Sequence, residues 1–341
     1  MAASSPIRVA CIGAGYFSQF HYGSWARIDD AILVGSCNRD IEKARETGLP
    51  AYDNLKKMLN ETSPDVLDII LPPVVHAESI RTALDCGVKT LVCQKPFCQS
   101  LEEAREMAML ADAAGARVIV HENFRFQPWY REMKRVLDRG EIGNVQQLTF
   151  RLRPGDGQGR DAYLARQPYF REMQRFLVHE TAIHWVDTFR YLLGDPVSVY
   201  ADLRQVNPAI AGEDAGYILS EHHGGVRSLF DGNRTLDHSA DNHRCTMGEG
   251  LLEGSEGTLS LRGDGSLWLR RFGSRQESCL LEPNACPGFG GDCVHHLQSH
   301  VISGLLGEQT IENEARSYLK VIEIETAIYA SSQTGQKLKL E

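Results

Sequence analysis

Short apolar runs alternate with helix-like segments of mixed polarity through the first third of the chain. The apolar runs are rich in β-branched residues and are bounded by turn residues, as inner strands of a sheet are. The strands predicted in this way are 8–12, 31–37, 66–71, 88–93 and 117–121. One of the helices between them opens with Ser100 and Glu103 at capping-box spacing. Strands that alternate with helices predict an α/β fold with a doubly wound, mostly parallel sheet.

The second half of the chain changes to the period of strands with one buried face. An amphipathic helix is predicted from Pro128 to Leu137, and Leu148, Phe150 and Leu152 then alternate with polar residues. Similar segments follow at 197–203, 215–221, 226–231, 251–253, 258–261 and 266–270. We therefore expect an α+β domain with a large open, mainly antiparallel sheet of six or so strands.

A final helix is predicted over about 312–332, with Ala315, Leu319, Ile322 and Tyr329 as its buried stripe. It is a candidate to pack back on the first domain. With 341 residues and a prior of about 150 residues per domain, two domains are expected. We place them at 1–122, which would bind a nucleotide cofactor, and at 123–341, which would bind substrate and support oligomerisation.

Composition excludes several classes of protein. Hydrophobic residues make up 42% and charged residues 24%, as in ordinary globular proteins. A net charge of −9 leaves no basic footprint for nucleic acid or an anionic membrane. The apolar runs fall short of the roughly 20 residues that span a bilayer, and the N-terminal segment lacks the pattern of a signal peptide. We expect a cytoplasmic protein.

Nine cysteines are scattered without a Cys-x-x-Cys pair, which favours reduced thiols over a disulfide framework or a zinc site. His295, His296 and His300 cluster near a predicted helix start, but no acidic residue stands at matching spacing. No metal is expected.

A glycine-rich turn follows the first strand. In Gly13-Ala-Gly15, the first glycine allows a tight turn and the second lets backbone N–H groups approach a pyrophosphate at the start of a helix. Ser18 stands where a third glycine is usual. This pattern predicts dinucleotide binding.

The second strand ends at Asn38-Arg39-Asp40, where an acidic residue normally binds the adenosine ribose. Asn38 can still hydrogen-bond a ribose hydroxyl, while Arg39 can pair with a 2′-phosphate, stack on adenine or be a solvated loop cation. Asp40 would disfavour a phosphate if its side chain faced inward. The residues thus leave NAD and NADP open.

Lys95 is expected just after the carboxyl end of a strand, because Pro96 stops the strand 88–93. Ligands of open parallel sheets bind outside the carboxyl ends of the strands, so Lys95 is a candidate catalytic residue. The alternative is a surface lysine in a loop.

Glu180 and His184 lie four residues apart and share a face of a predicted helix that ends at Gly194. Histidine suits proton transfer near neutral pH, and a carboxylate can orient it. His179 is five residues from His184, so this is not the zinc-binding His-Glu-x-x-His pattern. The alternative for His184 is a structural histidine.

The segment 153–169 combines three glycines with polar side chains that suit a polyol. Its candidate substrate contacts are Arg153, Asp156, Tyr163 and Arg166. The alternative is a flexible surface loop.

Taken in order, these motifs resemble the family of glucose-fructose oxidoreductase, inositol dehydrogenase and MocA-like proteins. The resemblance covers nearly the whole chain and rests on Gly13-Ala-Gly15, Pro72 with His76, Gln94-Lys95-Pro96, Asn123 to Pro128, Glu180 with His184, and Ser332 to Gly335. Three positions depart from the family: Gln94 replaces Glu, Glu180 replaces Asp, and Ser18 replaces Gly.

The resemblance implies a Rossmann domain followed by an open-sheet domain, and oxidation of a sugar or cyclitol with a nicotinamide cofactor. It implies cofactor contacts from Tyr16, Phe17, Pro72, His76 and Gln94 and a substrate contact from Asn123, beside the residues above. It also implies a homodimer or homotetramer and favours NAD.

The function expected from these residues is a sugar dehydrogenase. Alcohol oxidation removes a hydride and a hydroxyl proton, and we assign the proton to His184, substrate polarisation to Lys95 and the orientation of His184 to Glu180. The reverse roles of Lys95 and His184 are nearly as suitable. Catabolic aldose dehydrogenases of the family, which form a lactone, are the most similar type. The rivals are a nucleotide-binding sensor without redox turnover and a redox-assisted glycosidase.

Overall fold

The computed structural model describes residues 5–283, 285 and 288–340, so Cys286 and the first four residues lie outside the described part. The chain forms two compact units, and each is described by itself. The first unit comprises Met1–Asn123 and Val294–Ile322, and the second comprises Phe124–Cys293 and Glu323–Glu341.

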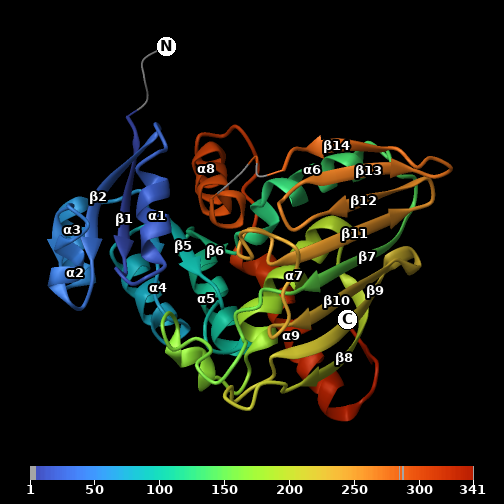
Figure 1. The fold of residues 1–341 in the computed structure, drawn as a ribbon. Helices are drawn as coiled ribbons and strands as arrows, with labels where there is room; N and C mark the ends of the chain where they lie inside the picture. The colour runs from blue at the N-terminus through green and yellow to red at the C-terminus, as the bar shows by residue number, and fades with distance from the viewer. Residues whose placement is uncertain (1–4, 284, 286–287, 341) are drawn as a thin grey trace. The chain divides into compact units, whose positions relative to one another are not determined.

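The first unit contains a six-stranded parallel sheet in the order β3-β2-β1-β4-β5-β6 (Figure 1). Its strands are β1 (Ile7–Ile12), β2 (Ala31–Cys37), β3 (Ala51–Tyr52), β4 (Val66–Ile69), β5 (Thr90–Gln94) and β6 (Arg117–His121). The predicted doubly wound sheet is confirmed. The sequence analysis missed β3, because two residues are too few to show a period.

Helices of the first unit connect these strands, and several begin where a polar side chain caps them. Ser100 Oγ accepts a hydrogen bond from the Glu103 N–H at 3.1 Å, as the capping spacing predicts, whereas the Glu103 carboxylate accepts from the Gln99 N–H. The helices between the strands are α1 (Ser18–Trp25), α2 (Ile41–Arg45), α3 (Leu55–Thr62), η1 (Pro73–Val75), α4 (His76–Asp85) and α5 (Leu101–Ala113). From Val294 on, α8 (Cys293–Leu305) also belongs to this unit.

The second unit contains a nine-stranded sheet in the order β14-β13-β12-β11-β7-β10-β9-β8-β15. The pair β10 and β7 is parallel and the other pairs are antiparallel. The strands are β7 (Val145–Leu152), β8 (Pro196–Arg204), β9 (Ala215–His222), β10 (Arg227–Asn233), β11 (Gly248–Gly254), β12 (Gly257–Leu261), β13 (Leu267–Arg271), β14 (Glu277–Leu281) and β15 (Leu338–Lys339). The predicted open, mainly antiparallel sheet is confirmed. The two edge strands β14 and β15 were missed, since neither shows the alternation of a buried face.

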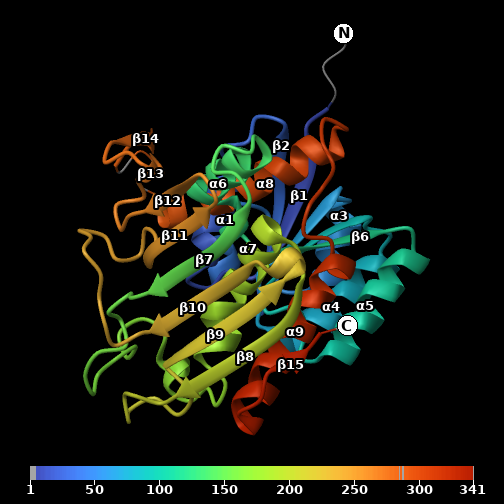
Figure 2. The ribbon, with the colours of Figure 1, turned by 90° about the vertical axis from the view of Figure 1, so that its right-hand side faces the viewer.

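One face of this sheet carries the core of the second unit. The core is built from the inward residues of the strands and from helix residues such as Trp129, Trp185 and Ile328. Figure 2 looks onto the strands β7 to β10 with α7 behind them. The helical segments of the unit are η2 (Phe124–Phe126), α6 (Pro128–Asp138), η3 (Pro168–Arg171), η4 (Leu177–Ala182), α7 (Ile183–Leu193), η5 (His223–Gly225) and η6 (Phe289–Gly291).

The last helix, α9 (Ala315–Thr334), runs through the division between the units. Its predicted stripe is partly wrong, because Leu319 and Ile322 are only half-buried while Tyr318 and Val321 are buried. Apolar residues occupy both of these neighbouring stripes, so helical spacing alone did not distinguish them.

No helix in the described part of the chain combines the length and the apolarity that a membrane span requires. Within the described residues, no group of three or more His, Cys, Asp or Glu side chains could hold a metal ion. The eight cysteines that the structure describes carry free thiols.

Candidate active site

The glycine-rich turn joins β1 to α1. Gly13 has a φ of +109°, and a Cβ there would lie 2.1 Å from the Ile70 carbonyl oxygen, so only glycine fits. A Cβ on Gly15 would meet no atom within 4 Å, which leaves open space beside the backbone of the turn. Ser18 replaces the third glycine and closes the turn by donating to the Gly15 carbonyl oxygen at 2.6 Å. A turn with free space at the start of a helix fits the pyrophosphate of a dinucleotide.

Two aromatic residues follow the glycines. Tyr16 is half exposed, while the Phe17 ring packs 5.3 Å from the Phe20 ring and 5.6 Å from the His21 ring. Tyr16 is therefore available at the surface of the turn, and Phe17 is tied to α1. Their contacts with a cofactor stay predictions.

Asn38 supports the glycine turn from the end of β2. Its Oδ1 accepts from the Ala14 N–H at 3.3 Å, and its Nδ2 donates to the Asp40 carbonyl oxygen at 2.9 Å. The Asp40 carboxylate in turn caps α2 by accepting from the Glu42 N–H at 3.2 Å. Arg39 is exposed. Asn38, which was expected at the adenosine ribose, thus also holds the glycine-rich turn between β1 and α1.

His76 joins the loop after β4 to the loop after β5. The residue is fully buried; its Nε2 donates to the Leu71 carbonyl oxygen at 2.7 Å, and its Nδ1 accepts from the Cys98 N–H at 3.5 Å. Burial lowers the pKa of His76 to about 4, so the ring is neutral at physiological pH. Pro72 precedes this segment and flanks η1. Both ring nitrogens of the predicted cofactor contact therefore have protein partners.

Lys95 lies directly after β5 and is half-buried. Its backbone N–H donates to Gln94 Oε1 at 3.1 Å, and the Gln94 side chain is buried beside the ring of His21. Gln94 thus points to the interior of the first unit. Asn123 is buried after β6. The neighbouring Glu122, which the sequence analysis overlooked, is buried and accepts from Tyr318 Oη at 3.2 Å.

The segment that carries Glu180 and His184 begins as a π-helical turn, η4, and only then continues as α7. This differs from the single α-helix that was predicted. The Glu213 carboxylate holds the turn by accepting from the Phe176 N–H at 3.1 Å and the Val178 N–H at 3.2 Å. A partner so distant in sequence could not be inferred from local spacing, and such π turns are common at functional sites.

His184 is buried on α7, and its ring stacks on Phe124 with a centroid distance of 3.9 Å. Arg125, next to Phe124, forms a bidentate ion pair with the fully buried Asp187, with distances of 2.7 Å (Nε–Oδ2) and 2.6 Å (Nη2–Oδ1). This pair fixes the segment of Phe124 to the helix of His184. From the sequence, Arg125 was recognised only as part of the family motif Asn123 to Pro128.

Ion pairs and hydrogen bonds within the second unit anchor its glycine-rich segment 153–169. Arg153 pairs with Asp231 at 2.5 Å, and Asp156 accepts from Arg234 Nη2 at 2.7 Å and from Arg166 Nη2 at 3.3 Å. Tyr163 Oη also donates to Asp156, at 3.0 Å. The four candidate substrate residues thus make ion pairs or hydrogen bonds within the protein, and their contact with substrate stays a prediction.

Arg234 organises this segment and was not found from the sequence. It is fully buried, lies 4.8 Å from the centroid of the Phe176 ring, and donates to Thr181 Oγ1 in η4 as well as to Asp156. It therefore links the glycine-rich segment to the turn that carries Glu180. An arginine after a strand carries no local signal of such a role.

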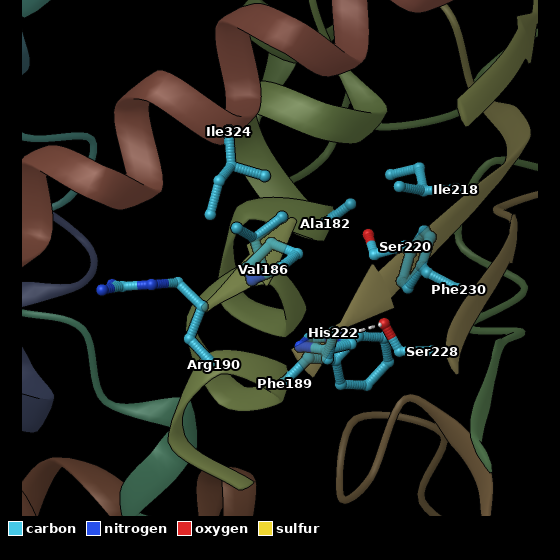
Figure 3. Close-up of a pocket in the computed structure, with 11 residues that line it drawn as sticks. Ala182, Val186, Phe189, Arg190, Ile218, Ser220, His222, Ser228, Phe230 and Ile324 are labelled. Carbon is cyan, nitrogen blue, oxygen red and sulfur yellow. Dashed lines mark hydrogen bonds between the residues drawn. The ribbon is translucent and has the colours of Figure 1, made fainter. Parts of the chain in front are cut away.

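A small cavity lies between α7 and the sheet of the second unit (Figure 3). Apolar side chains such as Val186, Phe189 and Phe230 dominate its lining. At its edge, His222 Nδ1 donates to the Gly194 carbonyl oxygen at 2.8 Å, so His222 Nε2 accepts from Ser228 Oγ at 2.9 Å. Its volume of about 20 Å³ suffices for one water molecule, far below the several hundred Å³ of a ligand site. It is a packing defect and not a substrate site.

Comparison with known proteins agrees with this geometry. Residues 7–122 match the model "Oxidoreductase family, NAD-binding Rossmann fold", and residues 130–260 match "GFO/IDH/MocA C-terminal domain". D-apiose dehydrogenase of Paraburkholderia graminis is 32% identical over 97% of this chain and 89% of that protein. The chain belongs to the Gfo/Idh/MocA family.

Further relatives support the assignment to this family. D-apiose dehydrogenase of Rhizobium rhizogenes is 30% identical over 75% of this chain and 73% of that protein. An oxidoreductase from Agrobacterium radiobacter, crystallised with NAD+, L-tartaric acid and magnesium, superposes with a TM-score of 0.88 at 26% identity and covers 98% of each chain. The protein is an NAD-dependent oxidoreductase, and the predicted family, fold class, enzyme class and cofactor are confirmed.

Proposed function

We propose that this member of the Gfo/Idh/MocA family is a sugar dehydrogenase that oxidises an aldose to its lactone with NAD. D-apiose is the first substrate to test, because D-apiose dehydrogenases are similar to the chain over most of its length. In this proposal the first unit binds NAD and the second binds the sugar. The domain boundary expected at 122 is part of the same proposal.

One observation carries the proposal: the Gly13–Gly15 turn and Lys95 follow β1 and β5 of one parallel sheet. The carboxyl ends of parallel strands lie at the same edge, where open α/β sheets bind their ligands. A dinucleotide held at the turn would therefore extend along the edge at which Lys95 stands. This arrangement supports Lys95 as a residue near the reacting atoms.

The chemistry of the side chains suggests their roles. NAD, when bound, supplies the hydride acceptor. His184 Nε2 or Nδ1 would take the proton of the sugar hydroxyl, the Lys95 ammonium would donate a hydrogen bond to the same oxygen, and Glu180 would orient His184. The stacking of His184 on Phe124 restricts its ring to one plane, as proton transfer in a fixed direction requires.

The contacts with cofactor and substrate are part of the same proposal. Gly13 and Gly15 would receive the pyrophosphate, while Asn38 and Arg39 would lie at the adenosine ribose. Asn123 and the anchored segment with Asp156 would contact the sugar.

The assembly and location of the protein are part of the proposal as well. An apolar row crosses the sheet face opposite the core. Tyr200 on β8 pairs with Leu219 on β9, which pairs with Leu229 on β10. Leu251 on β11 continues the row, with one residue of β7 between it and Leu229. A second copy of the chain would cover this row in a homodimer or homotetramer, which light scattering tests. Free thiols favour a reducing compartment, and we therefore propose the cytoplasm as the location of the protein. Cell fractionation tests this.

The test is the absorbance of reduced nicotinamide when the protein is mixed with NAD or NADP and with D-apiose, other aldoses and cyclitols. Growth of the band with an aldose and NAD supports the proposal. If no sugar increases the absorbance while NAD still binds, the proposal is contradicted and a nucleotide-responsive sensor is favoured. A glycoside that is cleaved without net reduction of NAD would instead indicate a redox-assisted glycosidase.

A further inference from the structure

A buried polar cluster lies behind Lys95 inside the first unit. Asp68 on β4 and His21 on α1 are both fully buried, and His21 Nδ1 lies 2.7 Å from Asp68 Oδ2. Trp25 Nε1 donates to the same carboxylate oxygen at 2.8 Å. A carboxylate removed from water in this way needs such donors, so the cluster is costly to build and specific in its geometry.

The cluster connects to the backbone of Lys95 through Gln94. The Lys95 N–H donates to Gln94 Oε1 at 3.1 Å, which fixes the orientation of the amide. Gln94 Nε2, which can only donate, then faces His21 Nε2 at 2.7 Å. His21 Nε2 must therefore be the unprotonated, accepting nitrogen, and the ring proton sits on Nδ1, where Asp68 accepts it.

The remaining groups around His21 are compatible with this single direction of hydrogen bonds. The His121 ring on β6 lies 4.1 Å from the His21 ring. Gln298 Nε2 on α8 lies 3.3 Å from both Asp68 Oδ2 and His21 Nδ1, and it donates to the carboxylate because a protonated Nδ1 cannot accept. Burial, and next the charge of Asp68, raise the pKa of the Cys11 thiol, which stays neutral. Asp68 Oδ2 is thus the acceptor for the proton on His21 Nδ1.

The family residue at position 94 would not fit this pattern. A glutamate has no N–H to donate, so it would need a proton on His21 Nε2 as well as the one on Nδ1. The departure from the family at Gln94 and the tautomer of His21 are therefore matched to each other. The loop is held a second time by the Cys98 N–H, which donates to His76 Nδ1 at 3.5 Å.

We propose that His21 is a positioning residue for Lys95, in which Asp68 selects the His21 tautomer, His21 orients the Gln94 amide, and Gln94 holds the Lys95 backbone. This rests on the proposed function in one respect, namely the role of Lys95 in catalysis. The hydrogen-bonded chain itself makes predictions that need no substrate.

The first test is ¹⁵N NMR of the full-length protein labelled at histidine, at about pH 7.5. The His21 signals are assigned by their loss in His21→Gln. We expect an unprotonated Nε2 and a protonated Nδ1, and in Gln94→Glu we expect the Nε2 signal to move to the protonated range. A protonated Nε2 in the unaltered protein, or no change in Gln94→Glu, would overturn the proposal.

The second test compares Gln94→Met with Gln298→Met, which remove the same group from the same cluster. Of these two glutamines, Gln94 accepts from the Lys95 N–H. Gln94→Met should therefore speed hydrogen exchange of that amide by about fivefold to tenfold, the equivalent of one net hydrogen bond. Gln298→Met should leave it within about twofold. Equal effects of the two changes would mean that the cluster stabilises the fold without positioning Lys95.

A third comparison uses His21 itself. In His21→Gln the side-chain oxygen can still accept from Gln94, whereas His21→Leu offers no acceptor. Lys95 amide exchange should therefore stay nearer to that of the unaltered protein in His21→Gln, and once a sugar substrate is established, kcat should follow the same order with the Kd of NAD unchanged. Equal exchange in the two variants contradicts the proposal. If the NMR and exchange results hold but no sugar is turned over, the proposed function fails and the positioning chain stands.

Discussion

The buried neutral His76 makes the stability of the first unit dependent on pH. Its pKa falls from 6.5 to about 4 on folding, mainly because of burial. Between about pH 6.5 and pH 4, His76 is protonated in the unfolded chain but stays neutral in the folded protein. The free energy of unfolding therefore falls as the pH is lowered. Each pH unit inside this window changes it by about 1.4 kcal/mol, and between pH 7.5 and 4.5 the loss amounts to about 2.5 kcal/mol.

His76→Gln isolates this contribution. The glutamine can still donate to the Leu71 carbonyl oxygen but loses the acceptor for the Cys98 N–H, so we expect a cost of about 1 kcal/mol at pH 7.5. Because glutamine does not titrate, the variant should become more stable than the unaltered protein by about 1.5 kcal/mol at pH 4.5. The two curves of unfolding free energy against pH should therefore cross.

Urea denaturation followed by tryptophan fluorescence, at several pH values between about 4.5 and 7.5, measures both curves, and the buried Trp25 reports on the same unit. Ser79→Ala is the control, because it removes a hydrogen bond from the same helix, the donation of Ser79 Oγ to the Val75 carbonyl oxygen, without removing a titrating group. Its curve should run parallel to that of the unaltered protein. A constant difference between the His76→Gln and unaltered curves would refute the reasoning.

Three further changes test the site. Lys95→Ala should lower turnover at least about 100-fold and leave the Kd of NAD within a few-fold, so full turnover in steady-state assays would remove Lys95 from the mechanism. Asn38→Asp should leave the preference for NAD over NADP, measured as the ratio of kcat/KM values, nearly unchanged; a large swing towards NAD would mean that the protein normally uses NADP. Asp187→Asn leaves Arg125 without its charged partner and should cost about 3 kcal/mol in urea denaturation. Glu249→Gln, which affects an exposed pair with Arg151 at 4.0 Å, is the control and should cost less than about 0.5 kcal/mol.

Fully buried strands were predictable from the sequence, because inner strands of a parallel sheet are apolar on both faces. β4 and β5 are buried at every position, and both were placed within two residues of their ends. The strands that escaped prediction are two residues long or exposed at an edge, as with β3 and β14. Their pairing is decided by neighbours that are distant in sequence.

The candidate site was predictable in residue type but not in the direction of its side chains. A glutamine before Lys95 carries no sign of whether it faces a cofactor or a buried histidine, and here it faces His21. The π-helical turn before His184 depends on the carboxylate of Glu213. Arg234 acquires its role only through the aromatic rings and the carboxylate that surround it in space.

Three backbone N–H groups in two loops at the carboxyl edge of the parallel sheet are held in the same way. Each donates a hydrogen bond to a side chain that ends or follows a strand or, for His76, opens α4. The pairs are the Ala14 N–H with Asn38, the Lys95 N–H with Gln94, and the Cys98 N–H with His76. Each of the three acceptors was expected at the cofactor, Asn38 from the dinucleotide-binding pattern and His76 and Gln94 from the family resemblance. Each in fact holds a loop that would meet the cofactor. Loops fixed before the ligand arrives lose less entropy on binding, so the edge is ordered in advance for a dinucleotide. It follows that replacing an acceptor should weaken NAD binding or catalysis through greater loop motion, even where the replaced side chain never touches NAD.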